Sequence, residues 1–298
     1  MCGIVGLFAK NAELQSHLGV HLENMLVTMS DRGPDSAGIA IYGATIAGKQ
    51  KLTAQSSSPE SEFPELRRVL DAQFAQAVSV EMIETHAVLQ VDAAVTDRVI
   101  EVLQNQFPLL RIMGRGESVA IFKEVGSPAE VAQRFGIAQM SGTHGIGHTR
   151  MATESAVTTR GAHPFSTGPD QCLVHNGSLS NHNNLRRELQ RQGVCFETEN
   201  DTEVAAAYLS YQIDCGLSLG EVLEGALHDL DGFYTFVVGT RTGFGVLQDP
   251  IACKPAVLAE TEDYVAFGSE YRALVHLPSI EKAHVWEPEP ATVYFWEH

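Results

Sequence analysis

A cysteine at the second position, followed at once by an apolar run, constrains this chain more than any other feature. Residues 2–9 are predicted to form a buried strand, which would place the Cys2 thiol at the very start of that strand. Removal of Met1 would give Cys2 a free α-amine, and such an amine, with an ordinary pKa of about 7.7 to 8.0, can deprotonate a thiol. Taken alone, the pattern also fits an ordinary core strand.

Four further motifs follow in a fixed order, and together with the start of the chain they resemble one family. They are Arg-Gly-Pro-Asp-Ser-Ala-Gly at 32–38, Gly-His-Thr-Arg at 147–150, His-Asn-Gly-Ser-Leu at 175–179 and Asn-Asp-Thr-Glu at 200–203. Each string is a weak signal by itself, but all five in this order resemble class II glutamine amidotransferases. These are N-terminal nucleophile hydrolases that release ammonia from glutamine.

The resemblance implies an α+β fold, the four-layer αββα sandwich of the N-terminal nucleophile hydrolases, built as a single glutamine amidotransferase type 2 domain over residues 1–298. Residues 47–141 carry none of the motifs, and we expect them to form an inserted small α/β segment. Within it, apolar periodicity predicts strands at 87–91 and 118–125 and helices at 97–106 and 128–135.

Outside that segment, the pattern predicts a helix whose apolar face runs from Leu14 to Met29, and then a strand at 36–42. We expect this strand to pair directly with the N-terminal strand. The serine-rich stretch at 56–61 is predicted to be a solvated loop. Further helices are expected at 183–192, 202–214 and 219–229, and further strands at 233–240, 245–247 and 264–267.

The resemblance also assigns roles to individual residues. It implies that the Asn176 side-chain amide and the Gly177 backbone N–H form the oxyanion hole for attack by Cys2. It implies further that Arg150 binds the α-carboxylate of glutamine and that Asp201 binds its α-ammonium group. From the residues alone, Asn-Gly is also a common turn, Arg150 fits a surface charge, and Asp201 fits the first turn of a helix.

Three other residues receive secondary roles from the resemblance. Arg32 is expected to order the loop around Cys2, while Thr153 and His163 are expected to lie in the wall of the substrate pocket. The twelve histidines form no HExxH motif and no regular ligand spacing, so we predict no metal site.

The charge of the chain limits its partners. With 37 acidic and 20 basic residues, its formal charge of -17 repels nucleic acid and anionic membranes, so neither is expected as a partner. Its five cysteines show no CxxC pair and no regular zinc spacing, and their odd number suits a reducing compartment. No apolar run is long enough to span a bilayer, and we expect a cytoplasmic protein.

The 298 residues contain no dinucleotide fingerprint and no P-loop, so the use of the released ammonia is expected on another subunit. The chain resembles most the separate glutaminase subunit of glutamate-synthase-like assemblies, especially N-methylglutamate synthase. That resemblance implies a hetero-oligomer in which the chain itself has no cofactor and a synthase partner carries FMN and an iron-sulfur cluster. Two alternatives stay open, namely a stand-alone hydrolase of γ-glutamyl amides and a non-catalytic regulatory or scaffold subunit.

Overall fold

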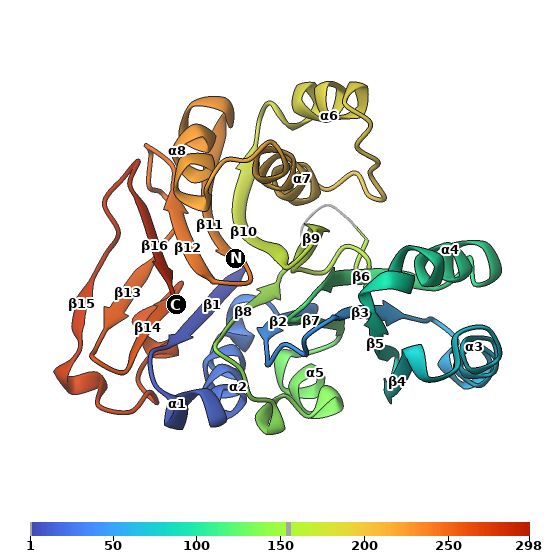
Figure 1. Cartoon of the computed structure of the whole chain (residues 1–298). Coiled ribbons are helices and arrows are strands. Elements are labelled where there is room, and N and C mark those ends of the chain that lie inside the picture. The colour runs from blue at the N-terminus through green and yellow to red at the C-terminus, as the bar shows by residue number, and fades with distance from the viewer. Residues whose placement is uncertain (1, 153–155) are drawn as a thin grey trace.

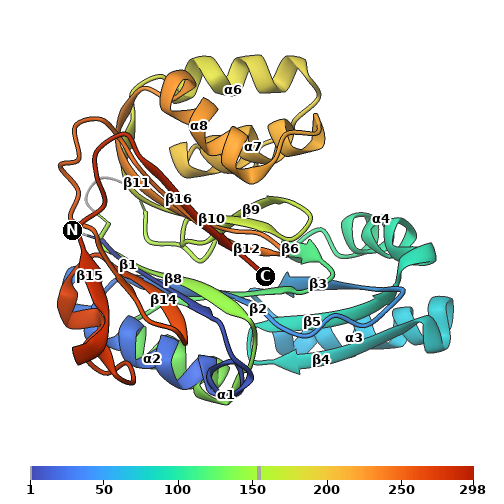
Figure 2. The ribbon, with the colours of Figure 1, turned by 60° about the vertical axis from the view of Figure 1, so that its left-hand side comes forward.

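The computed structural model describes residues 2–152 and 156–298, and they form four stacked layers (Figure 2). Two β-sheets face each other in the middle, and helices cover the outer face of each sheet. The predicted four-layer αββα sandwich is therefore confirmed. A smaller sheet with its own helices stands beside these layers (Figure 1).

The larger sheet has seven strands and carries the N-terminus of the chain near its middle. Its order is β15 (His284–Trp286), β13 (Val257–Glu260), β14 (Tyr264–Gly268), β1 (Gly3–Ala9), β8 (His144–Arg150), β2 (Ser36–Tyr42) and β7 (Val119–Val125). The predicted direct pairing of the first two strands is wrong, because β8 lies between β1 and β2 and pairs with both. The motif at 147–150 is thereby placed beside Cys2.

Strand β1 is buried on both faces, which explains why its sequence is apolar throughout rather than alternating. Ile4 and Phe8 face the second sheet, whereas Val5 and Leu7 face the helices on the other side. Those helices are α1 (Ala12–Ser16), α2 (Leu18–Thr28) and α5 (Pro128–Phe135). The single helix expected along the apolar face from Leu14 to Met29 is divided at His17, which caps α1 at its C-terminus.

The second sheet has five strands and lies over the first. Its order is β16 (Val293–Glu297), β12 (Gly243–Gln248), β11 (Gly232–Gly239), β10 (Gln171–Leu179) and β9 (Phe165–Gly168). Three helices cover its outer face, and they begin and end within one residue of the positions that the sequence predicts: α6 (His182–Arg191), α7 (Asp201–Asp214) and α8 (Leu219–Asp229). Helix α7 is buried along most of its length, from Thr202 to Ser210.

Residues 49–116 form a separate unit, which we call the inserted module. It consists of β3 (Lys49–Gln55), α3 (Pro59–Phe74), β4 (Val78–Ile83), β5 (His86–Asp92), α4 (Thr96–Gln106) and β6 (Arg111–Gly116). The strands are antiparallel in the order β4-β5-β3-β6, which is the ferredoxin-like βαββαβ arrangement. The two helices pack on one face of this sheet around Leu52, Leu66 and Leu89.

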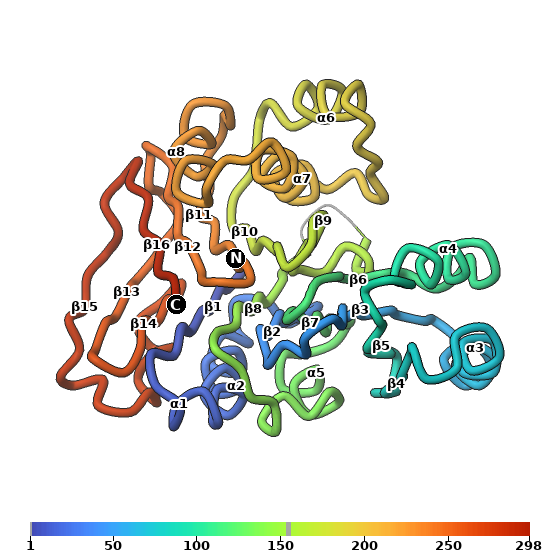
Figure 3. The backbone as a smooth tube through the Cα atoms, viewed as in Figure 1, coloured from blue at the N-terminus to red at the C-terminus, as the bar shows by residue number. Residues whose placement is uncertain are grey.

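The module is narrower than the segment expected at 47–141. Strand β7 pairs with β2 in the seven-stranded sheet, and α5 packs beneath that sheet, so both belong to the main layers. The tube in Figure 3 shows the chain leaving the main sheet after β2 and returning to it at β7. The solvated loop predicted at 56–61 is correct only in part, because residues 57 and 58 are exposed and precede the helix, whereas Ser56 is fully buried and α3 begins at Pro59.

Polar and aromatic contacts join the module to the main sheet. The Lys51 ammonium donates to the Ser118 carbonyl at 2.7 Å, and the Thr53 hydroxyl accepts from the Ile121 N–H at 3.3 Å. The buried ring of His86 meets the ring of Phe135 edge to face, with centroids 4.8 Å apart. Within residues 2–152 and 156–298, no helix has the length and apolar character needed to cross a membrane.

Candidate active site

Cys2 lies immediately before β1, where three of the sequence motifs meet. Its thiol lies 3.9 Å from the Met151 carbonyl oxygen, directly after β8. Its own carbonyl oxygen accepts one hydrogen bond from Arg32 Nε at 2.9 Å and another from Asn176 Nδ2 at 3.2 Å. Residues that are 30 and 174 positions away in the sequence therefore hold the backbone of Cys2.

Arg32 is the link between Cys2 and the end of β14. It ends the short 3₁₀ turn Ser30–Arg32, and its buried side chain forms an ion pair with Glu270. The hydrogen bond and charge of Arg32 lower the pKa of the Glu270 carboxyl group. Glu270 also pairs with Arg272 at 2.6 Å, so a small ion-pair network fixes this side of the Cys2 loop. This geometry fits the supporting role that we expect for Arg32.

Asn176 and Gly177 lie in β10 and reach the same place from the second sheet. The Asn176 side chain is buried, and its amide nitrogen contacts the Cys2 carbonyl. Gly177 has φ of +150°, and a Cβ atom there would lie 2.0 Å from the Phe233 carbonyl oxygen of the neighbouring strand. Only glycine fits this backbone without displacing β11. Of the predicted oxyanion-hole pair, Asn176 thus contacts Cys2 across the interface of the two sheets, and Gly177 follows it in β10.

A cavity of about 600 Å³ opens beside these residues, and we call it the Arg150–Asp201 cavity after two members of its wall. Arg150 is buried at the end of β8, and Asp201 is the first residue of α7. The Asp201 carboxylate accepts a hydrogen bond from the Leu179 N–H at 2.9 Å, which leaves its other oxygen toward His175. Ser178, next to Gly177, also lines the cavity. A guanidinium and a carboxylate thus share one pocket, as an amino acid zwitterion requires.

Cys2 itself is not among the residues that line this cavity. Two pairs of sequence neighbours connect Cys2 to the cavity. Met151 contacts the Cys2 thiol and directly follows Arg150 of the cavity wall, and Ser178 of the wall directly follows Gly177. The Arg150–Asp201 cavity therefore suits the amino acid end of a substrate whose other end extends toward the thiol.

His163 lies behind the cavity wall rather than in it. Its Nε2 is 2.9 Å from the Thr202 hydroxyl, and its ring stacks on His148 with centroids 4.0 Å apart. The same hydroxyl lies 3.0 Å from Nδ1 of His175. Burial lowers the pKa of His148 to about 3 and that of His163 well below its usual value, so both rings are neutral near pH 7. His163 thus contacts the helix start that carries Asp201, and not the cavity.

The predicted wall residue Thr153 lies outside the described residues. Among the described residues, no group of three or more histidine, cysteine, aspartate or glutamate side chains is arranged to hold a metal ion.

Two residues near the site, Asp35 and Lys123, were not singled out in the sequence analysis. Asp35 fixes the chain after β8, because its carboxylate accepts from the Ala152 N–H at 2.7 Å. The buried Lys123 ammonium donates to the carbonyls of Ala162 and Pro164, at 2.7 and 3.0 Å, next to His163. The Arg-Gly-Pro-Asp motif could have indicated Asp35, whereas Lys123 lies in a strand without any motif.

The comparisons with known proteins agree with this geometry. Residues 148–276 match the family model described as glutamine amidotransferase domain. The glutamine amidotransferase-like protein GlxB of Rhizobium meliloti is 65% identical over 298 residues, which cover 100% of this chain and 99% of that protein. The chain belongs to the class II glutamine amidotransferases. A putative glutamine amidotransferase of Methanothermobacter thermautotrophicus is 33% identical over 312 residues, which cover 99% of this chain and 99% of that protein.

Solved structures of this family share the fold at low identity. Glutamine phosphoribosylpyrophosphate amidotransferase from B. subtilis, in complex with ADP and GMP, matches 99% of the chain with a TM-score of 0.62 and 20% identity. This amidotransferase spans only 47% of that solved chain, so the match concerns about half of the larger protein.

Proposed function

We propose that this amidotransferase hydrolyses the side-chain amide of glutamine through a thioester on Cys2 and delivers the ammonia to a partner synthase subunit. One observation carries the proposal: Arg32 and Asn176 both bind the carbonyl of Cys2, beside a cavity that contains Arg150 and Asp201. Residues from four separate stretches of sequence therefore meet around Cys2, which supports their assignment as nucleophile, oxyanion donor and amino acid pocket.

The first chemical step uses the α-amine that removal of Met1 exposes. This amine takes the proton of the Cys2 thiol, and the sulfur attacks the amide carbon of glutamine. The amide oxygen becomes negative, and the Asn176 amide and the Gly177 N–H stabilise that charge. The protonated amine then gives its proton to the departing nitrogen, and ammonia leaves a γ-glutamyl thioester.

The second step consumes water. A water molecule, deprotonated by the α-amine, attacks the thioester carbon, and glutamate leaves with regeneration of the thiol. Throughout both steps, Arg150 holds the α-carboxylate through its planar guanidinium, and Asp201 holds the α-ammonium. This pair selects a free amino acid over a glutamine residue within a peptide, because a peptide lacks one or both charges.

The partner is proposed to be of the glutamate-synthase or N-methylglutamate synthase type, and to carry the FMN and iron-sulfur cluster that such a synthase uses. The chain then supplies ammonia and needs no cofactor of its own. Transfer between subunits is tested with glutamine labelled with ¹⁵N in its amide, in the presence of excess unlabelled ammonium. Label in the synthase product supports internal delivery, and unlabelled product contradicts it.

Reaction with a glutamine-analogue electrophile, 6-diazo-5-oxo-norleucine, tests the glutamine site itself. We expect one adduct per chain, located on Cys2 by peptide mass spectrometry, absent in Cys2→Ala and strongly slowed in Arg150→Lys. The exposed Cys215 serves as an internal control that the reagent is not simply alkylating thiols. Protein that has lost Met1 and still forms no adduct on Cys2 would contradict the proposal.

A further inference from the structure

A second cavity, of about 320 Å³, lies where the inserted module meets the main domain. Its walls come from β6 of the module, from β9, and from the loop before α7. We call it the module cleft. It shares Arg160, Glu197 and Thr198 with the Arg150–Asp201 cavity, so these residues separate the two spaces.

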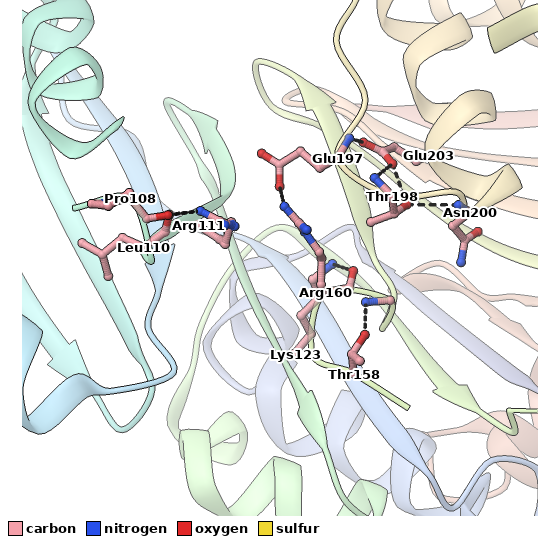
Figure 4. A network of polar contacts seen from close by, with 11 residues as sticks. Pro108, Leu110, Arg111, Lys123, Thr158, Arg160, Glu197, Thr198, Asn200 and Glu203 are labelled. Carbon is pink, nitrogen blue, oxygen red and sulfur yellow. Dashed lines mark hydrogen bonds and ion pairs between the residues drawn. The ribbon is translucent and has the colours of Figure 1, made fainter. Parts of the chain in front are cut away.

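Two arginines from different elements line the module cleft (Figure 4). Arg111 belongs to β6, and its Nη1 donates to the carbonyls of Pro108 and Leu110. Across the described residues, Arg111 has no carboxylate partner, and neither its Nε nor its Nη2 has a hydrogen-bond acceptor. Arg160 extends toward Glu197, with a nitrogen–oxygen distance of 3.3 Å between side chains that are 46% and 57% exposed. An ion pair this exposed is weak and exchanges readily.

The other carboxylate of the module cleft, Glu203, forms no ion pair with either arginine among the described residues. Glu203 accepts hydrogen bonds from the backbone N–H groups of Glu197 and Thr198, each at 2.7 Å, and from the Thr198 hydroxyl at 2.5 Å. Its acceptor capacity is therefore directed at its own loop. The buried Lys123 also lines the cleft, but burial lowers its pKa to about 7 and its amine donates to the Ala162 and Pro164 carbonyls, so Arg111 and Arg160 are the cationic groups that a ligand can reach.

Apolar side chains make up another part of the wall. Met113 and Phe165 are buried at the module cleft, and Ile112 and Val194 are partly buried there. An inorganic anion would leave this surface without a partner, whereas a carbon chain would cover it. The module cleft thus combines guanidinium groups that suit a carboxylate with a surface that suits methylene groups.

We propose that the module cleft is a second ligand site, which binds a small aliphatic carboxylic acid through Arg111 and Arg160. The free edges of the two guanidinium groups bind carboxylate oxygens, and the carbon chain lies against Met113 and Phe165. Binding needs no catalysis at Cys2, so this proposal can fail or succeed independently of the proposed glutaminase activity.

Alkylation of Cys195 provides a direct test, because this exposed thiol lines the module cleft. Purified full-length protein is treated with iodoacetamide, with and without succinate at constant ionic strength, and each cysteine is followed by peptide mass spectrometry. We expect succinate at about ten times its Kd to slow alkylation of Cys195 roughly tenfold. Exposed Cys215, which is outside the module cleft, should react at an unchanged rate.

Two variants locate the site. Arg111→Gln and Arg160→Gln should each remove the protection by succinate, whereas Arg191→Gln, on the exposed end of α6, should retain it. Arg111 also holds the turn before β6, so a thermal melt must first show that Arg111→Gln folds. If it does not fold, the variant of the exposed Arg160 alone provides the test.

Inorganic phosphate at the same ionic strength separates a carboxylic acid site from a general anion site. We expect it to protect Cys195 much less than succinate does, because it leaves the apolar wall uncovered. Equal protection by phosphate, no protection by succinate, or protection that survives in the folded arginine variants would each overturn the proposal.

Discussion

The Asn176 side-chain nitrogen carries two N–H bonds, and one of them points to the Cys2 carbonyl. Among the described residues, the second has no acceptor. In the proposed mechanism, the first bond fixes the amide against the Cys2 backbone, and the second donates to the substrate oxygen that becomes negative. This double use explains how a flexible side chain can be held ready before the charge develops.

The Asn176→Ala variant tests this assignment. We expect kcat for glutamine hydrolysis to fall by about 100- to 1,000-fold with little change in KM, because the lost hydrogen bond is made mainly to the transition state. The exposed Asn183→Ala variant is the matched control and should behave as wild type. A rise in KM alone would show that Asn176 binds the ground state instead.

The Thr202 hydroxyl is the second residue-scale feature, because it is the hydrogen-bond partner of two buried histidines, His163 and His175. Thr202→Val keeps the shape and removes the one hydrogen-bond partner that each ring has, since His163 Nδ1 and His175 Nε2 already lack one among the described residues. We expect the free energy of unfolding to fall by about 1 to 3 kcal/mol, as measured by urea denaturation at pH 7.5.

Thr202→Ser should restore most of that stability, since it retains the hydroxyl. The KM for glutamine provides a second readout, because Asp201 precedes Thr202 at the start of α7, and we expect KM to rise in the valine variant only. Equal stability of the valine variant and wild type would show that the two histidines find other partners.

At the scale of elements, the sequence predicted the parts of the fold that repeat a simple period or carry a motif. Helices α6, α7 and α8 were found because their apolar residues recur at helical spacing between capping residues. The order of β1 and β2 in the sheet was predicted wrongly, because strand order depends on contacts between segments that are distant in the sequence. Strand β8 enters between them from more than 100 residues further along the chain.

The start of α3 shows why the module was harder to predict. Its sequence before the first apolar residue is rich in serine and glutamate, which is typical of a loop. In the structure, Pro59 occupies the first turn, acidic residues Glu60 and Glu62 follow, and the buried Ser56 hydroxyl donates to Glu62. These features mark a helix start, but only once the module's sheet provides a face for Phe63 to pack on.

His86 lies at the boundary between the module and the main domain and makes that boundary sensitive to acid. Burial lowers its pKa to about 3, below the unfolded value of 6.5, so unfolding at pH 5 takes up a proton. Its contribution to stability is present above pH 6.5 and is lost as the pH falls toward 3. Other buried histidines, such as His144 and His148, act in the same direction.

The His86→Phe variant removes the proton that His86 takes up on unfolding and leaves the other histidines unchanged. Between pH 7 and pH 5, the wild type should lose about 2 kcal/mol more of its free energy of unfolding than this variant does. Urea denaturation at the two pH values measures the difference, and exposed His276→Gln should retain the wild-type loss. Identical losses in the wild type and His86→Phe would show that His86 takes up no proton on unfolding.

At the scale of the whole molecule, the loop before α7 joins the two cavities. Glu203 of α7 holds the backbone of Glu197 and Thr198, and both of these residues face the module cleft as well as the Arg150–Asp201 cavity. Arg160 is therefore available to either space but not to both at once. An event at the edge of the module can in this way alter the charge at the edge of the Arg150–Asp201 cavity.

This arrangement predicts that succinate weakens glutamine binding without changing the chemical step. When Arg160 turns to a carboxylate in the module cleft, Glu197 loses its counter-ion and repels the α-carboxylate of glutamine. An exposed ion pair contributes about 0.2 to 1 kcal/mol, so we expect the KM for glutamine to rise about 1.5- to 5-fold with kcat unchanged.

The variants decide whether the effect passes through the module cleft or arises from succinate competing for Arg150. Arg111→Gln should abolish it, because Arg111 lines only the module cleft of these two cavities. Glu197→Gln should abolish it too, since no charge remains to be released. If succinate protects Cys195 yet leaves KM unchanged, the module cleft binds its ligand without communicating with the glutamine site. If KM rises equally in Arg111→Gln, the acid acts in the Arg150–Asp201 cavity itself.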